Sequence, residues 1–222
     1  MLRGLFITGT GTGVGKTAVS AALMHRFRTT TQVRYWKPIQ TGIEQDDDTA
    51  TVRLLGECSG AEIFDSGVRL PNPVSPHLAA RLRGQQIDIE PLTALVAGES
   101  QSVCWIVEGA GGALVPINGR LMMTDLMHAL HLPVVVVAAS ALGTINHTLL
   151  TLEALRSRSL CVAGVVMVGD PNPENRAAIE QFGDISVLGE MPRFPSLTSQ
   201  ELGAWSRENL DAEGTLTEYL HG

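Results

Sequence analysis

The sequence predicts a doubly wound α/β fold, with a mostly parallel sheet flanked by helices. Strand-like runs alternate with helix-like stretches along the chain, and the central strands are nearly continuous apolar runs rich in β-branched residues, as at residues 134–137. Strands that lack polar alternation are covered on both faces, which is typical of parallel sheets. The strand–helix–strand order then favours a doubly wound topology.

The individual elements follow from hydrophobic spacing. The first helix is expected over residues 17–28 and a second clear helix over 145–158, because apolar residues recur there at helical intervals. The segment 42–101 is more polar and is expected to hold two or three helices over one end of the sheet. No structure is predicted for the tail after Pro195. Strands are expected at residues 5–8, 32–36, 103–107, 133–139, 162–168 and 187–188.

Length and charge narrow the class of protein. The chain has 222 residues and a formal net charge of −7, so we expect one domain over residues 1–222. An acidic chain is poorly suited to nucleic acid or an anionic membrane surface, so neither is expected as a partner. The first residues enter a strand without a signal-peptide pattern, and no apolar run approaches the about 20 residues of a membrane span. A cytoplasmic location is expected.

The cysteines indicate neither a zinc site nor a disulfide framework. Cys58, Cys104 and Cys161 are widely separated, and the sequence contains no CxxC pair. Cys104 and Cys161 belong to apolar, strand-like runs. We therefore expect buried, reduced thiols.

A glycine-rich turn connects the first strand with the first helix. Residues 9–17 read GTGTGVGKT, and a strand, a glycine-rich turn and a helix are the context of a phosphate-binding loop. Glycines allow backbone N–H groups to surround phosphate oxygens, and the helix N-terminus favours an anion. Thr10 occupies the position where the usual pattern begins with glycine. The expected nucleotide-binding residues are Gly13, Val14, Gly15, Lys16 and Thr17, with Lys16 on the terminal phosphates and the Thr17 hydroxyl on Mg²⁺.

Phosphoryl transfer also requires carboxylates for a metal and further positive charge. Glu108 ends a predicted strand, before the small residues 109–112, and the carboxyl ends of parallel strands are where such sheets bind ligands. Lys37 follows another strand, and Pro38 keeps it out of helical geometry. Of three consecutive aspartates, Asp48 is the favoured metal ligand, although the sequence leaves the choice among the three open.

Four segments in this order resemble the dethiobiotin synthetase family. They are the extended phosphate loop at residues 9–17, KPIQTG at 37–42, VEGAGG at 107–112 and LGTINH at 142–147. The resemblance spans residues 3–192 and includes a Ser-Pro-His segment at a suitable place. Each motif is moderately specific by itself, and the four together are highly specific.

The resemblance implies an ATP-dependent ligase of biotin biosynthesis. In this family, 7,8-diaminononanoate and CO₂ form a carbamate, whose oxygen attacks the γ-phosphate of ATP. The second amine then closes the ureido ring and expels phosphate. Such chemistry depends mainly on positioning and on charge neutralisation, with Mg²⁺ as cofactor.

Site roles are implied by matching positions. Thr12 would line the phosphates with the loop, while Lys16 and Lys37 would stabilise charge on the phosphoryl group and the carbamate. Thr41 would contact the carbamate or amine. The metal ligands would be Thr17, Asp48 and Glu108. The substrate-binding residues would be Thr41, Gly111, Gly143, Thr144 and Asn146, the last three at a helix N-terminus that binds the substrate carboxylate. In the family that helix belongs to the neighbouring subunit, which implies a homodimer.

Two departures from the family pattern concern the nucleotide. Gly13 stands where some relatives carry an acidic residue. Many relatives have an asparagine after the fifth strand that recognises adenine, but here the first asparagine is Asn172. We therefore expect base recognition that is either loose or made by the backbone between Gly189 and Pro192. ATP is the expected nucleotide, with another triphosphate left open.

Three other functions are alternatives to the one that this resemblance implies. A positioning ATPase of the ParA/MinD type shares the fold, but usually carries a second lysine early in the phosphate loop, where this chain has Thr10-Gly11-Thr12. An amide-forming ligase with a glutaminase domain needs a longer chain. An inactive phosphate-loop protein is disfavoured by the intact Lys16, Thr17, Lys37 and Glu108.

Overall fold

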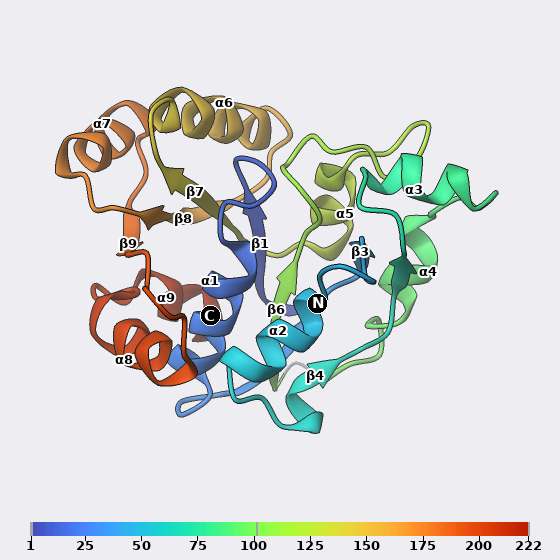
Figure 1. Ribbon diagram of the computed structural model, residues 1–222, viewed down its shortest axis with the longest axis horizontal. Coiled ribbons are helices and arrows are strands. Elements are labelled where there is room, and N and C mark those ends of the chain that lie inside the picture. The colour runs from blue at the N-terminus through green and yellow to red at the C-terminus, as the bar shows by residue number, and fades with distance from the viewer. Residues whose placement is uncertain (1, 101, 222) are drawn as a thin grey trace.

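Seven parallel strands form the main sheet, which confirms the predicted fold class. A computed structural model describes residues 2–100 and 102–221. The strand order is β4-β2-β6-β1-β7-β8-β9, so β1 lies at the centre (Figure 1). The strands are β1 (Arg3–Gly9), β2 (Gln32–Trp36), β4 (Ile63–Phe64), β6 (Val103–Glu108), β7 (Val134–Ser140), β8 (Val162–Gly169) and β9 (Val187–Met191).

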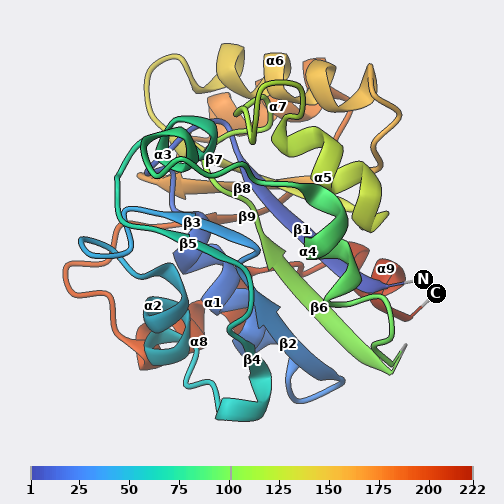
Figure 2. The ribbon, with the colours of Figure 1, turned by 90° about the vertical axis from the view of Figure 1, so that its right-hand side faces the viewer.

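Helices cover both faces of this sheet, as Figure 2 shows. The helices are α1 (Lys16–Phe27), α2 (Asp48–Leu55), α3 (Pro76–Leu82), α4 (Ile89–Ala94), α5 (Met123–Leu130), α6 (Thr144–Arg156), α7 (Pro173–Gly183), α8 (Ser199–Asn209) and α9 (Thr215–His221). Apolar residues of α1, α2, α8 and α9 pack in one core cluster, and those of α3 to α7 pack in another.

The two core clusters follow from the alternation of side chains along the strands. In β1, Leu5 and Ile7 join the cluster beneath α1, whereas Phe6 joins the opposite cluster. All six residues of β6 are buried. Because each face of the central strands meets a helix layer, these strands need apolar residues at every position, which is why they show no polar alternation.

The segment between β2 and β6 contains more than the expected helices. Helices α2, α3 and α4 are present, but so is a second, two-stranded parallel sheet of β3 (Ile39–Thr41) and β5 (Val68–Leu70). A single-turn 3-10 helix at Gly60–Glu62 precedes the edge strand β4. Three-residue strands that pair across about thirty positions leave no local hydrophobic period, so the sequence pattern did not reveal them.

The tail that the sequence left open folds onto the core. Helix α8 begins with a capping box, in which the Thr198 hydroxyl and the Glu201 carboxylate bind each other's backbone N–H. Trp205 of α8 and Leu216 and Leu220 of α9 are buried in the α1-side cluster.

Two expectations from the sequence need correction. Strand β9 continues to Met191, three residues beyond the expected end. Cys161 is exposed, because it precedes β8 rather than lying within it, whereas Cys58 and Cys104 are buried as expected. Within residues 2–100 and 102–221, no helix combines the length and apolar character that a membrane crossing requires.

Candidate functional site

The loop between β1 and α1 has the shape of a phosphate cradle. Residues 10–15 leave the central strand at Gly9 and turn directly into α1. Gly15, the N-cap of that helix, has φ 100°, and a Cβ there would lie 3.0 Å from the Val168 side chain. Only glycine combines this left-handed backbone with such close packing, so the turn depends on it.

Lys16 is folded back over the loop. Its Nζ donates a hydrogen bond to the Gly11 carbonyl oxygen at 2.9 Å, and the residue is 7% exposed. Burial, together with the nearby Lys37 ammonium, lowers the pKa of Lys16 to about 8. Lys16 is therefore a cation with no carboxylate in direct contact, positioned at a loop suited to anions.

Glu108, the last residue of β6, is completely buried and accepts four hydrogen bonds. Its Oε1 accepts from Lys37 Nζ at 2.8 Å and from Thr17 Oγ1 at 3.2 Å. Its Oε2 accepts from Ser20 Oγ at 2.9 Å and from Tyr35 Oη at 3.0 Å. One carboxylate oxygen is thus held by α1 and β2, while the other faces the predicted site residues.

Tyr35 remains a hydrogen-bond donor in this arrangement. Burial raises the pKa of the Tyr35 hydroxyl well above its usual value, and the charge of Glu108 raises it further. Ser20 and Tyr35 were not predicted as site residues. Their spacing from predicted site residues could have identified them, because Ser20 lies one helical turn after Thr17 and Tyr35 shares a strand face with Lys37.

Lys37 connects Glu108 with a second carboxylate. Its Nζ lies 2.6 Å from Asp48 Oδ2, and it also donates to the Gly109 carbonyl oxygen at 3.2 Å. Burial alone would lower the pKa of Lys37, but the charges of Glu108 and Asp48 outweigh it and raise this pKa. Burial would likewise raise the pKa of Asp48, yet the Lys37 ammonium holds it below the usual value.

The three consecutive aspartates have different contacts in the structure. Asp48 begins α2 and accepts a hydrogen bond from Thr17 Oγ1 at 2.7 Å. The side chain of Asp47 caps the same helix by accepting from the Ala50 N–H, and Asp46 is exposed. Of the three, Asp48 is the one that contacts Thr17 and Lys37, and its role as a metal ligand stays a prediction.

The oxygen atoms of Thr17, Asp48 and Glu108 fit a magnesium ion. The carboxylates of Asp48 and Glu108 both lie within hydrogen-bonding distance of the Thr17 hydroxyl, and Mg²⁺ is commonly bound by one or two carboxylates together with water and substrate phosphates. No group of three or more His, Cys, Asp or Glu suited to a metal occurs in the described part of the chain. A metal here would therefore depend on phosphate oxygens as well.

The small residues after β6 lie against the phosphate loop. A Cβ at Gly112 would be 3.2 Å from the Gly9 carbonyl oxygen, and Gly111 has φ 68°. Thr41, at the end of β3, is half-buried, and its neighbour Gln40 donates through Nε2 to the Asp46 carbonyl oxygen at 2.7 Å. This hydrogen bond connects β3 with the loop that precedes Asp48.

The other predicted residues lie apart from this cluster. Gly143 is the N-cap of α6, with φ 92°; Thr144 is buried and Asn146 exposed. Among the described residues, no hydrogen bond or ion pair links these three to Glu108 or Lys37. Thr12 and Gly13 are exposed on the phosphate loop.

Of the residues expected near the base, Gly189 lies inside β9. A Cβ there would be 2.9 Å from the Asn209 carbonyl oxygen and 3.3 Å from the Trp205 ring, so this backbone packs against α8. Pro192 follows the end of β9. The Asn172 side chain caps α7 by accepting from the Asn175 N–H.

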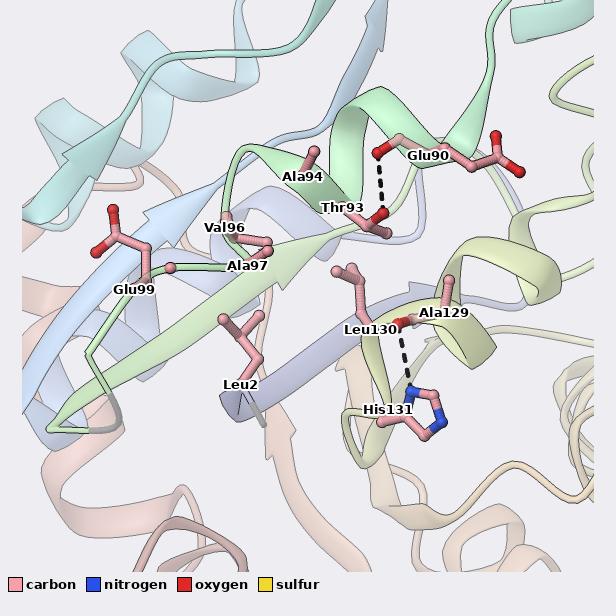
Figure 3. A pocket seen from close by; sticks show the side chains of 11 residues that line it. Leu2, Glu90, Thr93, Ala94, Val96, Ala97, Glu99, Ala129, Leu130 and His131 are labelled. Atoms are coloured by element: carbon pink, nitrogen blue, oxygen red, sulfur yellow. Dashed lines mark hydrogen bonds between the residues drawn. The ribbon is translucent and has the colours of Figure 1, made fainter.

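A hollow of about 470 Å³ lies elsewhere, between α4 and α5. Figure 3 shows Leu2, Thr93, Val96, Leu130 and His131 among its lining residues. None of the predicted site residues lines it. This hollow is therefore separate from the cluster of charged residues around Glu108.

Comparisons with known proteins identify the family of this chain. A family model described as an AAA domain matches residues 3–201. The ATP-dependent dethiobiotin synthetase BioD of Paramagnetospirillum magneticum is 50% identical over 198 residues, which cover 89% of this chain and 92% of that protein. The enzyme of the same name from Agrobacterium fabrum is 44% identical over 196 residues, covering 88% and 89%.

Among solved structures, the septum site-determining protein MinD complexed with Mg-ADP, from Pyrococcus horikoshii, aligns with a TM-score of 0.56 over 99% of this chain and 95% of that one. Its sequence identity of 16% indicates a shared fold alone. The sequence relatives match at far higher identity over nearly their whole length. On that basis, the chain belongs to the dethiobiotin synthetase family.

Proposed function

We propose that this protein closes the ureido ring of dethiobiotin from 7,8-diaminononanoate, CO₂ and ATP. One observation carries the proposal: Lys16, Lys37 and Glu108, from three separate segments, converge beside a phosphate loop at the carboxyl end of a parallel sheet. The chain's family membership selects this reaction among those that such a site could support.

Each group has a role that follows from its position. The N–H groups of residues 13–17 bind the triphosphate, and Lys16 stabilises charge on its terminal phosphates. Thr17, Asp48 and Glu108 would hold Mg²⁺, which neutralises phosphate charge when bound. ATP is the proposed nucleotide. The proposed location of the reaction is the cytoplasm.

The carbamate is the nucleophile of the first step. One amine of diaminononanoate adds to CO₂, and a carbamate oxygen then attacks the γ-phosphorus while the bond to the β-phosphate oxygen breaks. The second amine attacks the carbamate carbon, the ring closes and phosphate leaves. Lys37 and Thr41 would act on the carbamate, so that the protein contributes orientation and positive charge.

The substrate carboxylate would bind at the N-terminus of α6, near Gly143, Thr144 and Asn146. A thirteen-residue helix has free N–H groups and a favourable dipole at this end. Leu142 beside it and Leu150 on the same helix are large exposed apolar side chains. Such surface is typical of an interface, which supports a homodimer in which α6 completes the partner's site.

The ParA/MinD-type switch remains the alternative function, and the structural neighbours support it only at the level of fold. Such proteins can use a C-terminal amphipathic helix at a membrane. Here the apolar residues Leu216 and Leu220 of α9 are already buried against the core. The free apolar face that a membrane anchor requires is therefore not provided by these side chains.

Phosphate release by purified protein tests the proposal. Release from ATP should require both diaminononanoate and bicarbonate, and comparison of the triphosphates gives the base preference. Lys16→Ala and Lys37→Ala should each lower turnover at least about 100-fold, since each removes a charge-stabilising group. Release that is independent of diaminononanoate, or near-normal rates in either variant, would refute the proposal.

A further inference from the structure

Lys37 has no hydrogen-bonding capacity left for a substrate in this structure. A lysine ammonium has three donors and no acceptor. Here its three partners are Asp48 Oδ2 at 2.6 Å, Glu108 Oε1 at 2.8 Å and the Gly109 carbonyl oxygen at 3.2 Å. The side chain is 3% exposed. A lysine held in this way cannot contact a phosphoryl or carbamate oxygen without first releasing a partner.

We propose that Lys37 is a displaceable counter-ion, whose ammonium bridges Asp48 and Glu108 until a divalent cation binds these carboxylates. The released ammonium then turns towards the phosphoryl group and the carbamate. This inference rests on the proposed function, because it concerns how one catalytic residue of that reaction becomes available.

The charges of the cluster support such an exchange. Asp48 and Glu108 share the Thr17 hydroxyl, at 2.7 and 3.2 Å, so two carboxylates lie close together around one group. A fully buried carboxylate and a half-buried one beside it are stabilised by a nearby cation. Lys37 supplies one positive charge, whereas a divalent cation would neutralise both carboxylates and leave the ammonium beside a cation that repels it.

The surroundings of Lys37 also permit it to move. Its charge is carried on a flexible four-carbon side chain, and the residues after Glu108, at 109–112, have little side-chain bulk. The Lys16 ammonium, in comparison, donates to the Gly11 carbonyl oxygen and forms no ion pair with any carboxylate of the described residues. A divalent cation should therefore affect the two lysines differently.

The sequence offers an unusually clean probe, because Lys16 and Lys37 are its only lysines. Protein labelled with ¹⁵N-lysine should give two side-chain ammonium signals, which the Lys16→Met variant assigns. In a Mg²⁺ titration without nucleotide, the Lys37 signal should shift or broaden through faster proton exchange, while that of Lys16 changes less. An unchanged Lys37 signal at metal concentrations that saturate the site would overturn the exchange.

A binding measurement tests the same idea independently. Mn²⁺ binding to nucleotide-free protein can be followed by the electron paramagnetic resonance signal of the free ion. Lys37→Met should bind Mn²⁺ at least about tenfold more tightly than the unsubstituted protein, because no ammonium has to be displaced from the buried carboxylates. Lys16→Met is the matched control and should change affinity less than about threefold, since the bond that it breaks is to the Gly11 carbonyl oxygen and not to either carboxylate.

The outcomes separate this inference from the proposed function. Equal or weaker Mn²⁺ binding by Lys37→Met, or no binding to it at all, would reject the exchange even if ring closure is observed. Should Lys37→Met fail to fold, the lysine signals of the unsubstituted protein still decide the matter. Both measurements omit diaminononanoate and nucleotide, so a failure of the proposed reaction would leave their results interpretable.

Discussion

Two ion pairs join the β2 and β6 segments at different heights along the strands. At the carboxyl end, Lys37 and Glu108 lie 2.8 Å apart, with 3% and 0% of their side chains exposed. In the second pair, called the amino-end pair, Arg34 in the middle of β2 lies 3.2 Å from Glu99, which precedes β6, with 27% and 29% of their side chains exposed. The separations are similar, so the difference between the two ends lies in access to water.

That difference determines what each pair can do. Water screens the Arg34–Glu99 pair, and exposed pairs of this kind contribute only about 0–1 kcal/mol. The Lys37–Glu108 pair is coupled to Asp48, Thr17, Ser20 and Tyr35 without such screening. Glu99 also lines the α4–α5 hollow, but the interacting charges that chemistry requires lie at the carboxyl end.

Glu108→Gln should give the largest loss of stability. The variant leaves Lys37 with one carboxylate and places a neutral amide against Tyr35 and Ser20, so we expect the free energy of unfolding to fall by about 3 kcal/mol. Urea denaturation measures this. A loss no larger than that of Glu99→Gln would show that the two ends of the strands are energetically alike.

Tyr35→Phe should have a smaller effect, because it removes one of the two donors to Glu108 Oε2. A hydrogen bond to a charged group contributes about 2 kcal/mol, and we expect that loss in urea unfolding. Tyr219→Phe is the matched control, since Tyr219 is the chain's other tyrosine and its hydroxyl lies 3.9 Å from the Cys161 sulfur. Similar losses in both variants would contradict a special role for Tyr35.

The pKa of about 8 for Lys16 predicts pH-dependent triphosphate binding. Below pH 8 the ammonium is present in the nucleotide-free protein, and bound phosphates would raise its pKa. Affinity for a non-hydrolysable triphosphate should therefore be lost as pH rises through 8, by about tenfold between pH 7 and pH 9. Calorimetry at several pH values measures this.

Lys16→Arg provides the control for that profile, because a guanidinium stays charged throughout this range. Its affinity should be lower than that of the unsubstituted protein but nearly independent of pH. A flat profile in the unsubstituted protein would show that Lys16 does not titrate there.

Glu99→Gln should have the smallest effect, at most about 1 kcal/mol on unfolding, because its pair with Arg34 is half-open to water. Raised salt should reduce even this difference. Persistence of a larger loss at high salt would indicate that the amino-end pair is more strongly coupled than its exposure suggests.

The residue pattern predicted correctly those elements that form within one continuous segment of the chain. The strand, glycine turn and helix around residues 9–17 needed no distant partner, and the apolar runs of β1, β6, β7 and β8 were placed to within a few residues. The same reasoning failed for β3 and β5, whose pairing is set by contact between separate segments. It also misplaced Cys161, which lies one residue outside its strand.

The sequence by itself determined the parallel sheet, the phosphate loop and the edge at which Lys16, Lys37 and Glu108 had to emerge, because strand direction and periodicity are local properties. Only the tertiary structure decided that Asp48 rather than Asp46 reaches Lys37, and that Ser20 and Tyr35 hold Glu108. These contacts join residues 11 to 88 positions apart. Their partners are fixed by how helices and strands pack, which no local spacing encodes.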